Sequence, residues 1–340
     1  MFDIINKLLY PAIFVNIIVK HSSTTVYIEV IKNKVVINSA EKNFETTAVD
    51  EEMYEFITSY TRESPFYYIS LLDPSEEQGA VPTCSKNSIW NFSDLSNSEH
   101  ICFNNKWTYY SSNYDLLNLE KKYVTIGLDF LFSPFIILHN FFIDKIDTHK
   151  AMYVLIEESY MSLAIFDNSE LLFAQHIDVE NYKQSDELSM EDHSALEEEM
   201  EDMEDMEETI DLDDLDALEE LDDFGDIEDL DTLEEMDDFA QTKDLEEEFK
   251  QDEEIKLLER ESENFNEDYQ RFLLIQSAIK YFYKDDKFNS EFIETIYIAD
   301  SIKVSRDLKK YLEEEMFLSV YIRHMDLVKE ICETAKLELQ

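Results

Sequence analysis

The chain is 340 residues long, and 44% of its residues are hydrophobic and 13% aromatic, which is enough to build the core of two domains or of one bilobed domain. Its formal net charge of -51 disfavours nucleic acid and anionic lipid as partners, because binding phosphates requires a basic surface and no basic stripe is present. The chain has 3 glycines, none of them in a GxxxxGK[ST] or GxGxxG motif, so it lacks the usual glycine-rich cradle for nucleotide phosphates.

Residues 13–37 are predicted to form consecutive strands, because apolar runs and alternating residues are separated by short polar turns. A helix is predicted over Val49–Tyr60 and a buried strand over Pro65–Asp73. The stretch Pro74–Asn105 is predicted to be rich in loops, since it contains two prolines and a glycine. The next predicted elements are a helix over 116–121, a strand over 123–127 and a helix over 133–143.

The strand pattern returns at Ala151, where three apolar segments predict a second meander with turns at 157–160 and 167–169. Its order repeats that of the first meander. Beyond residue 260, helices and strands alternate, which predicts an α/β sheet whose final strands are parallel to their neighbours. These elements are a helix over 265–283, a strand over 292–300, a helix from an N-cap at Ser305 through Met316, a strand over 318–322 and a helix over 326–339.

The three cysteines, Cys84, Cys102 and Cys332, are odd in number and widely spaced, without a CxxC motif. We therefore expect neither a disulfide framework nor a zinc site, and a reducing cytoplasm fits best. The seven histidines are scattered without an HExxH motif, so no metal site is predicted. Charged residues and prolines interrupt the apolar stretches at 1–20 and 124–143, so both are expected to be buried in the fold. Direct membrane insertion is not expected, and any membrane association would come through a partner.

Most of the negative charge lies in residues 186–256, which contain 36 Asp and Glu against three Lys. Two near-repeats, LDDLDALEELDDF and IEDLDTLEEMDDF, place every apolar residue three positions after the last. On a helix this spacing winds around the axis and like charges repel, so we predict a disordered acidic insertion at residues 183–260. It is either a solvating spacer or a site for a basic, groove-bearing partner. Its candidate anchors are Leu212, Leu215, Leu218, Leu221, Phe224, Ile227, Leu230, Leu233, Met236 and Phe239.

Three segments resemble the actin-like ATPase superfamily, and within it the families of the pilus-assembly protein PilM and of the cytoplasmic domain of the type II secretion protein GspL. They are Val19–Val36, Tyr153–Ile177 and Phe292–Ile322, in the order that the family has them. The resemblance implies an α/β, bilobed fold of duplicated ribonuclease-H-like βββαβα units, with two phosphate-binding hairpins and an adenosine-side strand and turn. The implied boundaries are a first lobe over 1–149 with an inserted subdomain at about 47–115, and a second lobe over 150–182 and 261–340 that surrounds the acidic insertion.

The chain departs from this family at each nucleotide contact. The family's Asp-x-Gly-Ser-Ser is replaced by Val19-Lys20-His21-Ser22-Ser23, and its second Asp-x-Gly, near residues 155–157, gives way to a turn through Glu157 and Glu158. Two carboxylates at a phosphate site are repulsive, so we expect a degenerate cleft without a cofactor. Hydroxyls at residues 22–25, including Thr25, could still offer hydrogen bonds to a phosphate. The expected cleft residues are His21, Ser22, Ser23, Thr24, Glu157, Glu158 and, in place of a glycine pair, Ala299, Asp300 and Ser301.

More than one function is open at this stage. The resemblance implies a non-catalytic cytoplasmic adaptor of a type IV pilus, type II secretion or DNA-uptake machine, peripheral to the inner membrane. It would link a PilN-like single-span inner-membrane protein to the secretion motor ATPase. The alternative is a divergent actin-like ATPase or small-molecule kinase that binds Mg-ATP through substitute contacts. A third interpretation is an acidic chaperone or decoy that acts through residues 186–256 alone.

Overall fold

The computed structural model describes residues 9–148, 150–179, 267–288, 290–304 and 306–339. The chain divides into two compact units, Met1–Tyr182 with Asn264–Gln340, and Lys183–Glu263. The acidic insertion, its apolar anchors and its basic partner are predictions on the second unit, which lies outside the described residues. Every element named below belongs to the first unit.

The first sheet consists of β1 (Ala12–Val19), β2 (Thr24–Lys32), β3 (Val35–Phe44), β4 (Tyr67–Leu72) and β8 (Phe130–Phe132), in the order β3-β2-β1-β4-β8. The first three strands form an antiparallel meander, whereas β4 is parallel to β1 and β8 is parallel to β4. Helix α2 (Glu51–Thr61) joins β3 to β4 and begins at Asp50, whose carboxylate accepts a hydrogen bond from the Met53 N–H at 2.8 Å. The elements predicted over residues 13–73 are therefore confirmed.

Two strands of a small three-stranded sheet lie in the stretch Pro74–Asn105 that was predicted to be rich in loops, and the third follows it directly. Its strands, β5 (Gln78–Val81), β6 (Ser98–Phe103) and β7 (Trp107–Ser112), are antiparallel in the order β5-β7-β6, and the short helix α3 (Lys86–Ile89) lies between β5 and β6 in the chain. Strands of four to six residues among turn-forming residues leave little alternation to detect.

The prediction that the cysteines form no disulfide is wrong. Cys84, just after β5, is bonded to Cys102 of β6, and only Cys332 is free among the described cysteines. The two bonded residues are 18 positions apart, and their proximity depends on the small sheet that the sequence did not reveal. Disulfides persist mainly in oxidising compartments, so cysteine usage does not support a reducing cytoplasm.

A second prediction fails at the end of α4 (Asn113–Tyr123), where a strand was expected over residues 123–127. Tyr123 is buried at the end of this helix, and its carbonyl accepts hydrogen bonds from the N–H groups of Ile126 and Gly127. Gly127 takes a φ of 75°, which glycine adopts readily, and the chain turns there. The strand of this region begins at Phe130, and α5 (Pro134–Phe141) and α6 (Ile143–Ile146) follow it.

The second sheet consists of β9 (Ala151–Ile156), β10 (Tyr160–Asp167), β11 (Glu170–Asp178), β12 (Thr295–Asp300) and β13 (Ser319–His324), in the order β11-β10-β9-β12-β13. Strand β10 is antiparallel to its two neighbours, whereas β12 is parallel to β9 and to β13. This repeats the first sheet strand for strand, so the duplicated α/β fold is confirmed. A helix over residues 267–284 precedes η2 (Asp286–Phe288) and β12, and α9 (Arg306–Glu315) follows β12; the N-cap predicted at Ser305 lies outside the described residues.

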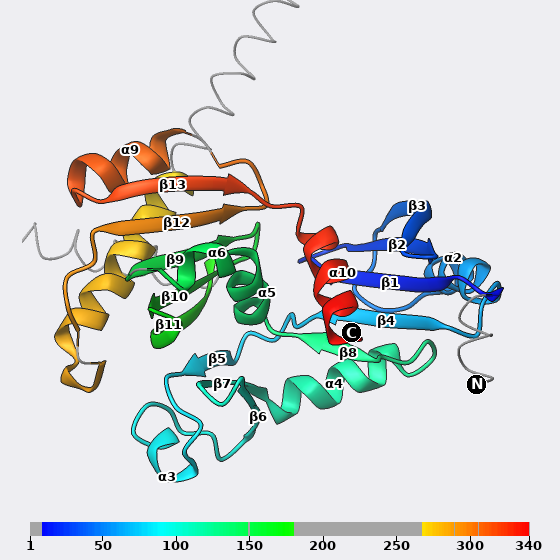
Figure 1. Ribbon diagram of the computed structural model, residues 1–340, viewed down its shortest axis with the longest axis horizontal. Coiled ribbons are helices and arrows are strands. Elements are labelled where there is room, and N and C mark those ends of the chain that lie inside the picture. The colour runs from blue at the N-terminus through cyan, green and yellow to red at the C-terminus, as the bar shows by residue number, and fades with distance from the viewer. Residues whose placement is uncertain (1–8, 149, 180–266, 289, 305, 340) are drawn as a thin grey trace, which may run out of the picture. The chain divides into compact units, whose positions relative to one another are not determined.

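The helix α10 (Leu327–Glu338) leaves the second sheet and packs against the first (Figure 1). It contacts β1, β2, β4 and α5, and Ile331 is fully buried there. Lys336 Nζ lies 2.5 Å from Oε1 of the buried Glu29 on β2, and the Tyr27 hydroxyl donates to the same carboxylate at 3.0 Å. The predicted boundaries assign all of 261–340 to the second lobe, whereas α10, which lies in this range, packs against the first sheet.

One apolar cluster connects the two sheets through the helices between them. It includes Phe14 of β1, Leu138 of α5, Tyr153 of β9 and Ile331 of α10. A separate cluster with α2 and α4 covers the opposite face of the first sheet, and another with α9 and the helix over 267–284 covers that of the second. In the described part of the chain, no helix combines the length and the apolar character needed to cross a bilayer.

Candidate functional site

The three segments that the sequence assigns to the cleft meet around one pocket. Lys20 follows β1, Glu158 follows β9 and Ser301 follows β12, and all three line a pocket of about 410 Å³. Because β9 and β12 are parallel, their carboxyl ends lie at the same edge of the sheet, which is where α/β folds usually bind ligands. We call this pocket the central cleft.

Lys20 links the first hairpin to the second across the central cleft. Its Nζ lies 3.4 Å from Glu158 Oε2 and 3.9 Å from Glu157 Oε1. The Glu157 side chain is 5% exposed, and this burial raises the pKa of its carboxyl group, although the nearby Lys20 and the Glu158 N–H oppose the rise. The Lys20 ammonium group therefore offsets part of the negative charge that Glu157 and Glu158 place between the hairpins.

The threonine hydroxyls of the first hairpin are engaged by protein groups. Thr24 Oγ1 donates to the Thr46 carbonyl at 2.6 Å, and Thr25 Oγ1 donates to Asn43 Oδ1 at 2.8 Å. Thr24 is buried, Ser23 is half-buried, and His21 and Ser22 are exposed. Phosphate binding by hydroxyls would therefore depend on the two serines.

Asp300 occupies the turn after β12 with its own side chain. The backbone N–H groups of Ile302, Lys303 and Val304 donate to its carboxylate at 3.1, 2.7 and 3.1 Å. Successive backbone N–H groups of this kind form anion-binding concavities, and here the anion is an internal carboxylate. Ser301 Oγ donates to the Ile156 carbonyl at 2.8 Å, which ties the end of β12 to β9, while Ala299 is buried in the cluster between the sheets.

The helix over residues 267–284 contributes charges that the sequence analysis did not single out. Arg271 is 5% exposed and lines the central cleft, with Nη1 3.0 Å from Asp268 Oδ1 and Nη2 2.9 Å from Glu267 Oε2. Its Nε has no hydrogen-bond partner among the described residues. The spacing of these charges is visible in the sequence, but it is the same in ion pairs on solvated helices.

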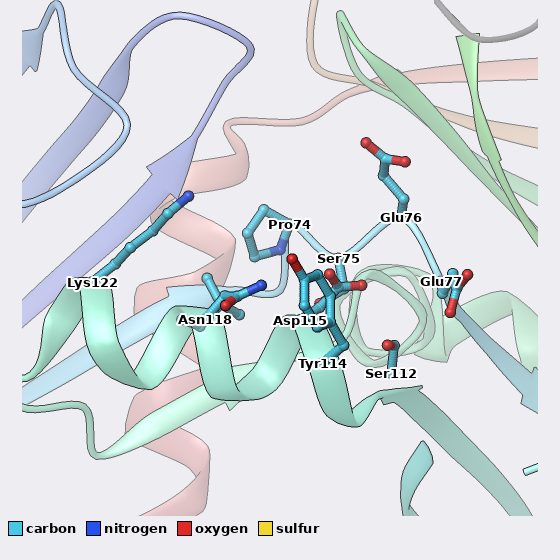
Figure 2. Close-up of a pocket in the computed structure, with 10 residues that line it drawn as sticks. Pro74, Ser75, Glu76, Glu77, Ser112, Tyr114, Asp115, Asn118 and Lys122 are labelled. Atoms are coloured by element: carbon cyan, nitrogen blue, oxygen red, sulfur yellow. The ribbon is translucent and has the colours of Figure 1, made fainter. Parts of the chain in front are cut away.

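A second pocket, of about 540 Å³, lies where the chain enters and leaves the small sheet (Figure 2). One wall is the segment Pro74–Glu77 after β4, and the other is a face of α4 that carries Asp115, Asn118 and Lys122 at successive turns. We call it the α4 pocket. No sequence motif reveals this pocket, because its two walls are about forty residues apart in the chain and meet only in the fold.

Buried hydrogen bonds fix the loop wall of the α4 pocket. The Ser75 hydroxyl donates to the Asp73 carboxylate at 2.5 Å, and the Ser111 hydroxyl donates to the same group. Burial, followed by the charges of Glu77 and Asp73, raises the pKa of the Asp115 carboxyl. A cationic group in the pocket would relieve this repulsion between carboxylates. No three His, Cys, Asp or Glu side chains of the described residues are arranged to hold a metal ion.

The strand order found twice in this chain, with an antiparallel second strand in each sheet, defines the actin-like fold. The chain is similar to a Bacteroides thetaiotaomicron protein with an actin-like ATPase fold and unknown function, at 13% identity and a TM-score of 0.43 over 99% of this chain and 98% of that one. It is also similar to the PilM-PilN type IV pilus biogenesis complex, at 9% identity and a TM-score of 0.46 over 94% of this chain and 89% of that one.

A third similar structure is the ethanolamine utilization protein EutJ from Carboxydothermus hydrogenoformans, at 8% identity and a TM-score of 0.40 over 95% of this chain and 89% of that one. Residues 152–340, more than half of the chain, match the model of a domain of unknown function, DUF8341, and the protein belongs to that family. Residues 10–139 match a second model, the domain of unknown function DUF8569. No curated protein matches the sequence.

Proposed function

We propose that the protein is a non-catalytic adaptor with an actin-like fold, which binds partner proteins instead of hydrolysing a nucleotide. The observation that carries this proposal is that the polar groups of the central cleft bind one another. Lys20 pairs with Glu157 and Glu158, and Asp300 takes up the backbone N–H groups after β12. A nucleotide would have to displace these contacts and would bring its phosphates close to two carboxylates.

Contacts between the small sheet and the second sheet also favour a scaffold. Strand β5 of the small sheet contacts β11 of the second sheet, and the Phe92 and Phe288 rings lie 6.2 Å apart. Trp107 of β7 packs edge-on against Phe166 of β10. Enzymes that close over a ligand need a hinge that rotates freely, and these packed contacts oppose such a rotation.

The system that we propose for the adaptor is a type IV pilus, type II secretion or DNA-uptake machine. There it would connect a PilN-like single-span inner-membrane protein to the secretion ATPase and lie at the membrane through that partner. The α4 pocket is our candidate site for the cytoplasmic tail of the membrane protein. Its carboxylates, including Glu76, Glu77 and Asp115, suit a tail with a lysine, an arginine or a free amino terminus.

A peptide-binding measurement tests the partner proposal. The probe is a fluorescent synthetic peptide of the cytoplasmic tail of a single-span protein encoded beside a hexameric secretion ATPase, titrated with the full chain. We expect saturable binding that the Asp115→Asn variant weakens by about tenfold, because a partly buried charge pair is lost. Glu99→Gln, an exposed site on β6 outside the pocket, is the matched control and should bind like the wild type. Equal affinities for the two variants would reject the α4 pocket as the site.

The alternative, a divergent ATPase or kinase, is favoured by the cationic Lys20, Arg271 and Lys303 around the central cleft. A thermal-shift titration of the full chain with Mg-ATP separates the two functions. Binding at 100 times Kd would add about 2.7 kcal/mol to the free energy of unfolding, so a true site would raise the melting temperature clearly. We expect no shift at millimolar Mg-ATP, and a saturable rise would replace the adaptor by the enzyme.

A further inference from the structure

A third hollow, separate from the central cleft and the α4 pocket, is an open apolar groove of about 790 Å³ on the first sheet. It lies on the face that α10 covers. Phe14 of β1, Ile31 of β2, Val36 of β3 and Tyr68 of β4 line it, together with Leu339 at the end of α10. We call it the sheet groove.

The sheet groove leaves apolar side chains in water beside a well-packed core. Val36 is 50% exposed, Tyr10 is 45% exposed and Leu339 is 41% exposed, whereas Phe14 at the inner end is 5% exposed. Helix α10 contacts β1, β2 and β4 and leaves the part of the sheet toward β3 open. A patch of this kind on a folded protein usually has an occupant.

We propose that the occupant is residues 1–8 of the same chain. This segment, MFDIINKL, joins the described structure at Leu9, and Tyr10 directly after it lines the sheet groove. The segment therefore starts at the mouth of the hollow. Eight residues reach about 12 Å as a helix and about 26 Å when extended, whereas β1 and β3 are two strand spacings, or about 10 Å, apart.

The chemistry of the segment fits an apolar groove. At helical spacing its five apolar residues fall on one side, and Asp3, Asn6 and Lys7 fall on the other. The exposed Lys34 at the rim of the sheet groove offers Asp3 an opposite charge, since Lys336 is already held by Glu29 at 2.5 Å. The apolar residues are Met1, Phe2, Ile4, Ile5 and Leu8.

A membrane surface is the competing destination for an amphipathic segment. Helices that lie on membranes are rich in Lys and Arg on the polar side, whereas this segment has one Lys and one Asp. The net charge of -51 on the chain adds repulsion from anionic lipid. The groove therefore suits the segment better than a bilayer does.

The test uses a fluorescent peptide of residues 1–8 and two forms of the protein, the full chain and the chain without these residues. We expect the peptide to bind the shortened chain and to bind the full chain at least about tenfold more weakly, because a tethered segment competes at high effective concentration. In the full chain, Ile5→Asp should restore peptide binding, whereas Asn6→Asp on the polar side should not. Because Ile5→Asp and Asn6→Asp are compared in the full chain, they test the proposal even if the shortened chain folds poorly.

The groove itself is tested on β3. In the shortened chain, Val36→Asp should lower the affinity for the peptide by about tenfold or more, because a charge replaces an apolar contact. Val35→Asp is the matched control, since Val35 is 61% exposed on the same strand but points to the other face, and it should have no effect. Absence of peptide binding, equal effects of the two valine variants, or sedimentation of the full chain but not Ile5→Asp with phosphatidylglycerol vesicles would each overturn the proposal.

Discussion

At the residue scale, polar side chains around the central cleft are engaged by one another and by the backbone. Asp300 places its carboxylate on three backbone N–H groups, and Lys20 lies between two glutamates. These contacts give partners to the buried carboxylates of Glu157 and Asp300 and to the backbone N–H groups of residues 302–304. We therefore expect these side chains to contribute to the stability of the fold.

Asp300→Ala tests this view directly. Removal of the carboxylate leaves three N–H groups without their acceptor, so the free energy of unfolding should fall by about 1–3 kcal/mol, as measured by urea denaturation. Asp300→Asn keeps one oxygen acceptor and should lose clearly less. Equal stability of the wild type and the alanine variant would mean that water replaces the carboxylate at no cost.

At the element scale, the small sheet has the largest influence on the candidate sites. Through Ser112 at the end of β7 it contributes to the α4 pocket, and through β5 it reaches the second sheet. A sheet of three short strands is only marginally stable alone, so the Cys84–Cys102 bond is an important part of its stability.

Loss of that bond should have a measurable effect. Because the cysteines are 18 positions apart, Cys84→Ser should lower the stability of the oxidised protein by about 3 kcal/mol in denaturant titrations. The control is the same pair of proteins in a thiol reductant, where the two midpoints should converge. A wild-type midpoint that does not respond to the reductant would show that the bond does not contribute to stability.

The sequence predicts the two meanders well because most of their strands are apolar runs, buried on both faces and separated by short polar turns. Phe14 and Ile18 of β1 face one core cluster, while Val15 and Ile17 face another, so a local pattern carries the information. The small sheet, the disulfide and the α4 pocket depend on pairings between distant segments, which a local pattern does not encode. The cleft segments were found through the family resemblance, whereas Arg271 on the neighbouring helix was missed for lack of any motif.

At the scale of the whole molecule, the first and second sheets share one apolar cluster, and we expect them to unfold together. The apolar cluster between them takes residues from β1, β9, α5 and α10, and ion pairs between Lys20 and the second hairpin connect them further. Proteins with a shared core of this kind usually unfold in one transition.

Ile331→Ala examines that cooperativity. The Ile331 side chain of α10 is fully buried, so its truncation should lower the free energy of unfolding by about 2–5 kcal/mol. Amide hydrogen exchange should become faster by the same factor in β1 and in β9. Leu337→Ala, which is 57% exposed on the same helix, is the control and should change stability by less than about 0.5 kcal/mol. Faster exchange in β1 alone would mean that the sheets unfold independently.

The return of α10 to the first sheet also governs the order of events during synthesis. Strands β1 to β4 leave the ribosome early, but residues 327–338, which cover their inner face, emerge only after the entire second sheet has been made. Until then, the apolar inner face of the first sheet is uncovered in the nascent chain, and such intermediates are prone to aggregate. A stop codon shortly before residue 327 should therefore yield insoluble chains even though both sheets are encoded in full.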